Sequence, residues 1–171
     1  MFCIFSTATA GQISNYQESG WYVLGKEVKA FEHEFASFHG DSFHSIGVAN
    51  GTDAIALCLK VLGFGNGDEV ITASHTAVAT VAGIEQAGCA PVFADIELNS
   101  RCIDPESVKK RITNKTKAIM PVHIYGKVAN MKKIMGIAEI NGLQVVEDCS
   151  QAHGAEVDNQ KVGTFSCLSA F

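Results

Sequence analysis

The sequence predicts an α/β fold in which a mostly parallel sheet is covered by helices on both faces. Short apolar strand patterns alternate with amphipathic helix patterns from residue 45 onwards. The strand patterns are rich in Val, Ile and Ala, which is typical of strands buried on both faces. Turn signals such as GFGNG at 63–67 separate the two kinds of segment. Repeated strand–helix–strand units form parallel sheets with right-handed crossovers.

The individual elements follow from periodicity and from residues that begin or end helices. Large apolar residues recur at three- and four-residue spacing before Gly40, which predicts a first helix. A capping Asp104 followed by Pro105 is a typical helix start. The expected helices are 26–39, 52–62, 76–87, 104–111 and 130–140, and the expected strands are 45–49, 69–73, 91–95, 117–122, 143–146 and one within 162–171.

Composition limits the classes of protein to which the chain can belong. An apolar content of 47% with a net charge of −5 is typical of a globular protein, and the excess of acids over bases argues against nucleic acid as a partner. No apolar run approaches the length of a membrane span. The six cysteines form no CxxC pair, and the N-terminus lacks the basic start of a signal peptide. We therefore expect a cytoplasmic protein.

Polar residues follow several predicted strands, and in parallel α/β sheets ligands bind beyond these carboxyl ends. The stretch from Asn50 to Asp53 combines a glycine, a hydroxyl and the free N–H groups of a helix N-terminus, which suits a phosphate. The alternative is that Thr52 or Asp53 only caps the helix. The GFGNG turn is not a dinucleotide motif, because it precedes a strand and Asp68 replaces the last glycine.

Asp148 ends an apolar strand in the stretch VVEDCSQAHG. A buried carboxylate is costly unless it holds a cation or accepts strong hydrogen bonds, so a partner is expected. A protonated ring nitrogen would serve, and Arg101 or Arg111 is the protein alternative. The neighbouring Glu147 is expected to point the other way by strand alternation and has no assigned role.

The histidines at strand ends are His75 and His123. Together with Asp148 and His153 they make a metal site conceivable, but their spacing matches no zinc pattern, and no metal is expected. Cys149 beside Asp148 is interpreted as a small buried residue rather than a nucleophile, because nothing in the sequence indicates a lowered pKa.

Several of these motifs, read in order, resemble one family. The stretches SGWYVLGKEVKAFEHEFA, GVANGTDAIALCL, GDEVITASHTAVATVAGIEQAGCAPVFADIE, IDPESVKKRITNKTKAIMPVHIYG and VVEDCSQAHGA closely resemble the DegT/StrS-type aminotransferases. These enzymes use pyridoxal phosphate (PLP) to aminate keto groups on nucleotide sugars. The resemblance implies that residues 18–171 are part of the large PLP-binding domain of a fold type I transferase. Residues 1–17 are an atypical N-terminal segment, and the C-terminal part and small domain are expected to be absent.

The resemblance also implies roles for individual residues. Asp148 would pair with the protonated pyridine nitrogen, so that the ring remains an electron sink, and Gln151 would lie near the phenolic oxygen. Ala77 stands where relatives have an aromatic residue stacked on the ring, so His75 is expected to supply that flat face. The implied cofactor-binding residues are Gly51, Thr52, Asp53, His75, Asp148 and Gln151, and the implied substrate-binding residues are Trp21, Tyr22, His123 and Tyr125.

The family lysine that bonds covalently to PLP is expected a few positions beyond Phe171. No catalytic residue is therefore assigned, and the 171 residues alone are expected not to transaminate. The resemblance implies L-glutamate as amino donor, a keto-sugar nucleotide as acceptor, a homodimer, and a place in amino-sugar or cell-surface polysaccharide biosynthesis. Two alternatives stay open: a PLP-dependent sugar dehydratase, in which histidine replaces the lysine, and a non-catalytic binding protein that is stable as a half-domain.

Overall fold

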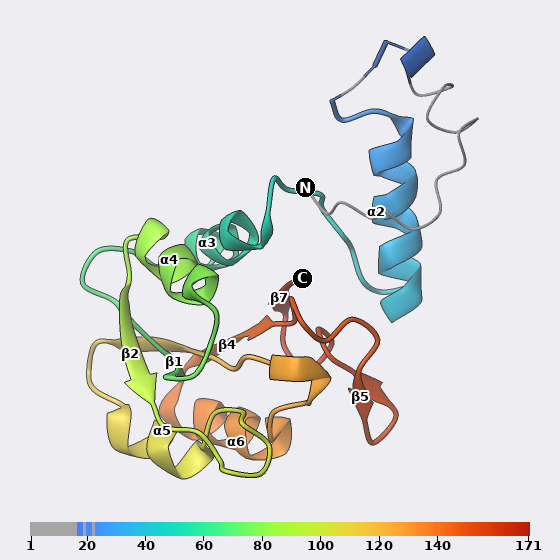
Figure 1. The fold of residues 1–171 in the computed structure, drawn as a ribbon. Coiled ribbons are helices and arrows are strands. Elements are labelled where there is room, and N and C mark those ends of the chain that lie inside the picture. Colours follow the sequence, from blue (N-terminus) through green and yellow to red (C-terminus); the bar gives the residue numbers. More distant parts are fainter. Residues whose placement is uncertain (1–16, 19, 22) are drawn as a thin grey trace. The chain divides into compact units, whose positions relative to one another are not determined.

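The structure is a computed structural model that describes residues 17–18, 20–21 and 23–171. The chain forms two compact units, Met1–Ala49 and Asn50–Phe171 (Figure 1). This division does not coincide with the boundary expected at residue 17, which stays a prediction because residues 1–16 lie outside the described part of the chain.

The first unit contains the helix α2 (Lys26–His39), whose bounds are those expected from the apolar spacing. It ends at Gly40, which has a φ of 132° and whose N–H donates to the carbonyl of Ala36 at 3.1 Å. The prediction of a strand at 45–49 is wrong, because these residues pair with no strand in the described chain. Gly47 instead donates its N–H to the carboxylate of Glu32 at 2.7 Å.

The second unit contains a sheet of five parallel strands in the order β2-β1-β3-β4-β7 (Figure 1). The strands are β1 (Glu69–Ala73), β2 (Ala90–Ala94), β3 (Thr116–Met120), β4 (Gln144–Asp148) and β7 (Leu168–Ala170). Four of them agree with expected strands to within a few residues, and the register aligns Asp148 with Ala170. The prediction of a mostly parallel sheet is confirmed.

Helices cover both faces of this sheet, as predicted, and each face has its own apolar core. Side chains alternate between the faces along every strand. Val70 of β1 packs with Ile55 and Leu59, and Ile71 packs with Ile134 on the other side. The covering helices are α3 (Gly51–Val61) and α4 (Val78–Gln86) on one face, and α5 (Pro105–Arg111) and α6 (Met131–Asn141) on the other.

The helices α3 and α4 approach closely because Gly83 has no side chain. A Cβ atom at this position would lie 2.7 Å from Cγ2 of Ile55 and 2.9 Å from the carbonyl oxygen of Thr52. Close packing at Gly83 therefore sets the position of the first turn of α3. None of the described helices is both long and apolar enough to span a bilayer.

The segment after β4 differs from the single strand expected at 162–171. A short hairpin of β5 (Glu156–Val157) and β6 (Gln160–Lys161) comes first, joined by Asp158 and Asn159, which both have positive φ as tight hairpin turns require. Only Leu168–Ala170 then joins the sheet. Two-residue strands have too little alternation to be recognised in a sequence.

Candidate functional site

A pocket of about 250 Å³ lies at the carboxyl edge of the sheet in the second unit. It is bordered by the first turn of α3, the segment from β1 into α4, and the end of β4. Four residues predicted from sequence line it, namely Gly51, Thr52, Asp148 and Gln151. The edge of the sheet predicted to hold a ligand is therefore the edge that contains the pocket.

The N-terminus of α3 presents two free amide groups to this pocket. Asn50 caps the helix, because its Oδ1 accepts the N–H of Asp53 at 2.9 Å. The N–H groups of Gly51 and Thr52 donate to no residue in the described chain, and both residues line the pocket. Free amides at the positive end of a helix dipole form an anion site.

The prediction for Asp53 needs correction. Its N–H is occupied by Asn50, and its carboxylate accepts hydrogen bonds from Asn50 and from Gln86 of α4, each at 2.9 Å. Asp53 does not line the pocket. The cap is thus Asn50, not Thr52 or Asp53, and the Asp53 carboxylate links the first turn of α3 to Gln86 of α4.

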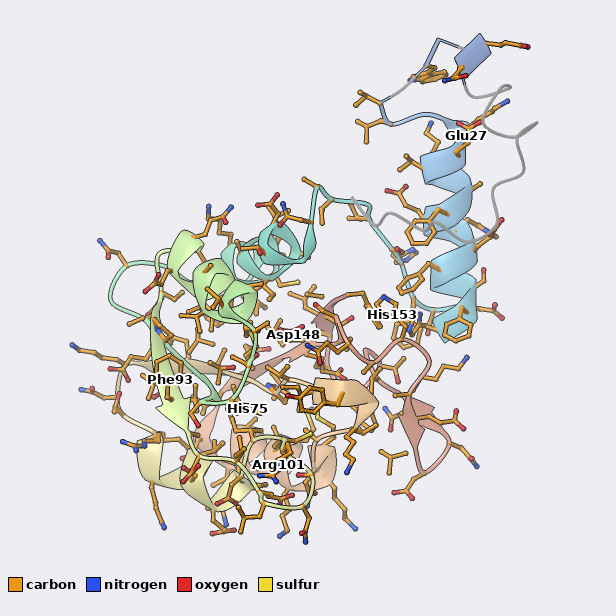
Figure 2. The ribbon with its side chains drawn as sticks, in the orientation of Figure 1. Glu27, His75, Phe93, Arg101, Asp148 and His153 are labelled. Atoms are coloured by element: carbon orange, nitrogen blue, oxygen red, sulfur yellow. The ribbon has the colours of Figure 1, made fainter. Side chains whose placement is uncertain are left out.

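Asp148 lies at the other side of the pocket and is labelled in Figure 2 at the end of β4. The segment that follows β3 holds its backbone: the N–H donates to the carbonyl of Pro121 at 2.9 Å, and the carbonyl accepts the N–H of His123 at 3.0 Å. The residue is 4% exposed. Its Oδ2 accepts the hydroxyl of Thr80 at 2.7 Å, and its Oδ1 accepts the hydroxyl of Ser150 at 2.8 Å and its N–H at 3.2 Å.

Neither protein cation proposed for Asp148 reaches it. Arg101 and Arg111 are exposed, and no Lys, Arg or His of the described residues forms an ion pair with Asp148. The donors that surround the carboxylate are neutral hydroxyls and one amide. The pocket therefore offers a buried acid that no protein cation neutralises, which suits a cationic group of a ligand.

Three predicted residues form a hydrogen-bonded set beside the pocket. Nε2 of His75 lies 3.0 Å from the hydroxyl oxygen of Tyr125. The backbone N–H of Tyr125 donates to Oε1 of Gln151 at 3.0 Å. Tyr125 has a φ of 57° and a ψ of 25°, a conformation that is strained for a bulky residue. The ring of His75 pairs with Tyr125 and does not line the pocket, whereas Ala77 does. The expected stacking face is thus not formed by His75 in this geometry.

The prediction that His123 borders the cleft is wrong, because its side chain is fully buried. Its Nδ1 accepts the N–H of Ala129 at 3.1 Å, so the ring proton is on Nε2, which lies 3.1 Å from Oε2 of Glu147. The ring is held on the side of β4 that faces away from Asp148.

Glu147 is the site-adjacent residue that sequence reasoning left without a role. Its carboxylate also accepts the N–H groups of Gly163, Phe165 and Ser166 at 2.8 to 3.0 Å, and the hydroxyl of Ser166 at 2.9 Å. Burial opposes ionisation, but the hydrogen bonds from His123, Gly163 and Ser166 outweigh it and hold the pKa of Glu147 below its ordinary value. Glu147 thereby fixes the loop that leads into β7.

His123, Glu147 and Cys149 place potential metal ligands within 4.8 Å of one another. Both nitrogens of His123 are already hydrogen-bonded. Burial, reinforced by the charges of Glu147 and Asp148, raises the pKa of the Cys149 thiol far above its ordinary value. Cys149 is fully buried, in agreement with its interpretation as a small core residue.

The two residues expected at the substrate site from the N-terminal region belong to the first unit. Trp21 is 59% exposed, and its indole N–H donates to the carbonyl of Val23 at 2.8 Å. Tyr22 lies outside the described residues. Their roles stay predictions.

A parallel α/β sheet whose carboxyl edge holds free helix amides and a buried acid agrees with the class of fold type I PLP-dependent transferases. The chain belongs to the DegT/DnrJ/EryC1/StrS aminotransferase family, whose sequence profile matches residues 6–171. It is 45% identical over 154 residues to dTDP-3-amino-3,6-dideoxy-alpha-D-galactopyranose transaminase of Aneurinibacillus thermoaerophilus, covering 90% of this chain and 42% of the relative.

Two further similarities bear on the sugar and the cofactor. The chain is 41% identical over 150 residues to UDP-N-acetyl-3-dehydro-alpha-D-glucosamine 3-aminotransferase of Acidithiobacillus ferrooxidans, covering 88% of this chain and 40% of that protein. The crystal structure of NtdA from Bacillus subtilis with bound cofactor PMP matches with a TM-score of 0.85 and 32% identity, over 92% of this chain and 35% of that one. The chain thus spans about two fifths of the length of the curated relatives it matches.

Proposed function

We propose that this chain forms the PLP-holding part of an aminotransferase that aminates a keto-sugar nucleotide, with L-glutamate as the amino donor. The observation that carries the proposal is the buried Asp148, which faces a pocket without any protein cation in the described chain. PLP, when bound, supplies a protonated ring that accepts electrons from the substrate's Cα bond. The pocket fits this group because it offers free amides for a phosphate and an acid for the ring nitrogen.

The residues of the pocket have distinct tasks in this proposal. The N–H groups of Gly51 and Thr52 bind the phosphate. Gly51 lies close to Ser150, because a Cβ atom at this position would come within 3.4 Å of the Ser150 hydroxyl. Asp148 holds the proton on the pyridine nitrogen. Since Oε1 of Gln151 accepts from Tyr125, the side-chain NH₂ of Gln151 is the group left to donate to the phenolic oxygen.

The class of amino-group acceptor is proposed from the names of the relatives, because these names include dTDP-linked and UDP-linked sugars. We propose that Trp21, Tyr22 and Tyr125 contact this substrate, and we withdraw His123 from that set because it is buried. A cytoplasmic location and a homodimeric assembly complete the proposal.

Cofactor binding is tested by titrating the purified protein with PLP. Replacing Asp148 by Asn removes a buried charge that would pair with the ring, so the dissociation constant is expected to rise roughly tenfold to hundredfold, because charged hydrogen bonds contribute about 1.5–3 kcal/mol. Asp95→Asn is the control, since Asp95 lies directly after β2 at the same edge of the sheet but is exposed and does not line the pocket. Equal affinity of wild type and Asp148→Asn would show that PLP does not use this site.

Amino transfer is proposed to require a lysine supplied from outside these residues. Every lysine of the chain lies in the described part of the structure, and none lines the pocket. The isolated 171 residues are therefore expected to release no 2-oxoglutarate from L-glutamate, with or without a keto-sugar nucleotide. A polypeptide that extends beyond them to such a lysine is expected to do so. Turnover by the isolated chain would contradict this part of the proposal.

A further inference from the structure

Two threonine hydroxyls form consecutive hydrogen bonds that end at the buried carboxylate of Asp148. The hydroxyl of Thr76 lies 2.8 Å from that of Thr80, and the hydroxyl of Thr80 lies 2.7 Å from Oδ2 of Asp148. Thr80 is 1% exposed and belongs to the first turn of α4, whereas Thr76 precedes that helix. All three residues line the pocket.

The carboxylate determines the direction of these hydrogen bonds. A hydroxyl has one proton to donate, and an ionised carboxylate can only accept. Thr80 must therefore give its proton to Asp148, and its oxygen must accept the proton of Thr76. The hydrogen bonds therefore run from Thr76 through Thr80 to Asp148, and each polarises the next.

The threonine hydrogen bonds end at Oδ2 of Asp148, whereas Ser150 donates to Oδ1. Oδ1 accepts both donors of Ser150, and Oδ2 accepts only Thr80. A carboxylate oxygen has about two acceptor sites, so Oδ2 is the oxygen with more remaining capacity. Because Thr80 lies in the first turn of α4, its hydrogen bond ties the Asp148 carboxylate to that helix.

We propose that Thr80, oriented by Thr76, is a positioning residue that holds the carboxylate of Asp148 aimed at the ring nitrogen of PLP. The proposal rests on the proposed function. The proton shared by Asp148 and the ring has two positions, a carboxylate beside N–H⁺ or a carboxylic acid beside a neutral nitrogen. Hydrogen bonds donated to the carboxylate favour the first position, in which the ring is the better electron acceptor.

The test follows the protonation of the ring nitrogen directly. PLP labelled with nitrogen-15 at the ring is bound to the purified protein, and the NMR shift of that nitrogen is measured at one fixed pH. In Thr80→Val, the shift is expected to move toward that of unprotonated pyridine, and the dissociation constant of PLP is expected to rise about tenfold. Thr80→Ser keeps the hydroxyl and is expected to restore both values. Thr76→Val is expected to move the shift less, in the same direction.

Thr72→Val is the matched control, because Thr72 is equally buried and donates its hydroxyl to the carbonyl of Met120 at 3.0 Å, away from the acid. It is expected to leave the nitrogen shift unchanged. An unchanged shift in both Thr80→Val and Thr76→Val, with Asp148→Asn still displacing it, would overturn the inference and leave the proposed function intact. If Asp148→Asn also left the shift unchanged, the proposed function itself would fail.

Discussion

At the scale of residues, two adjacent acids at the end of one strand have separate tasks because successive side chains face opposite sides of a sheet. Asp148 faces the pocket and is surrounded by neutral donors. Glu147 faces the loop at 163–166 and accepts its backbone N–H groups. The sequence indicated that Asp148 needed a partner. The role of Glu147 was not visible, because its donors are supplied by a loop and by His123, and only the fold brings them together.

Replacing Glu147 by Ala is expected to lower the free energy of unfolding by roughly 3–5 kcal/mol, because the buried donors of the loop and of His123 would lose their acceptor. Chemical denaturation measures this loss. Glu139→Ala, at an exposed position of α6, is the control and is expected to stay within about 0.5 kcal/mol of wild type. A loss of similar size in the two variants would contradict the structural role of Glu147.

The lowered pKa of Glu147 also implies that the stability of the protein depends on pH. The pKa of Glu147 is lower in the folded chain than the ordinary value of about 4.3, so below that value the unfolded chain binds a proton that the folded chain does not. The stability contributed by Glu147 is present above pH 4.3 and is lost as pH falls toward the folded pKa. Glu147→Gln is expected to flatten this part of the stability curve, and an unchanged slope would contradict the assignment.

At the scale of elements, the helices were more predictable than the segments between them. The bounds of α2 were predicted correctly, because the spacing of four apolar residues and the glycine after the last turn indicate the same helix. The strand expected at 45–49 failed because a short apolar run says nothing about whether a neighbouring strand is available to pair. The expected start of α4 at Thr76 was early: the helix begins at Val78, which leaves Thr76 free to donate to Thr80.

The cap of α3 gives a prediction that separates stability from binding. Asn50→Ala removes the acceptor of the Asp53 N–H and is expected to cost about 1 kcal/mol of stability. It also loosens the turn that presents the amides of Gly51 and Thr52, so PLP affinity is expected to fall. Asp104→Ala removes the corresponding cap of α5 at a similar cost in stability, but is expected to leave PLP affinity unchanged. Equal effects of both variants on affinity would exclude the helix terminus as the phosphate site.

At the scale of the whole second unit, the pocket exists because the parallel order of the strands brings separate chain segments to one edge. The end of β4, the first turn of α3 and the start of α4 are distant in the sequence and meet around Asp148. Alternating strand and helix patterns were enough to predict this edge. The pocket's finer chemistry was not predictable, since Thr80 resembles any small residue of an apolar helix until its hydroxyl is seen beside the acid.

A crystal structure of the protein grown with PLP tests the proposed cofactor site most directly. We expect the phosphate at the N–H groups of Gly51 and Thr52, and the ring nitrogen within hydrogen-bond distance of Asp148. PLP found elsewhere, or bound in this pocket with its ring nitrogen turned away from Asp148, would contradict the proposed site.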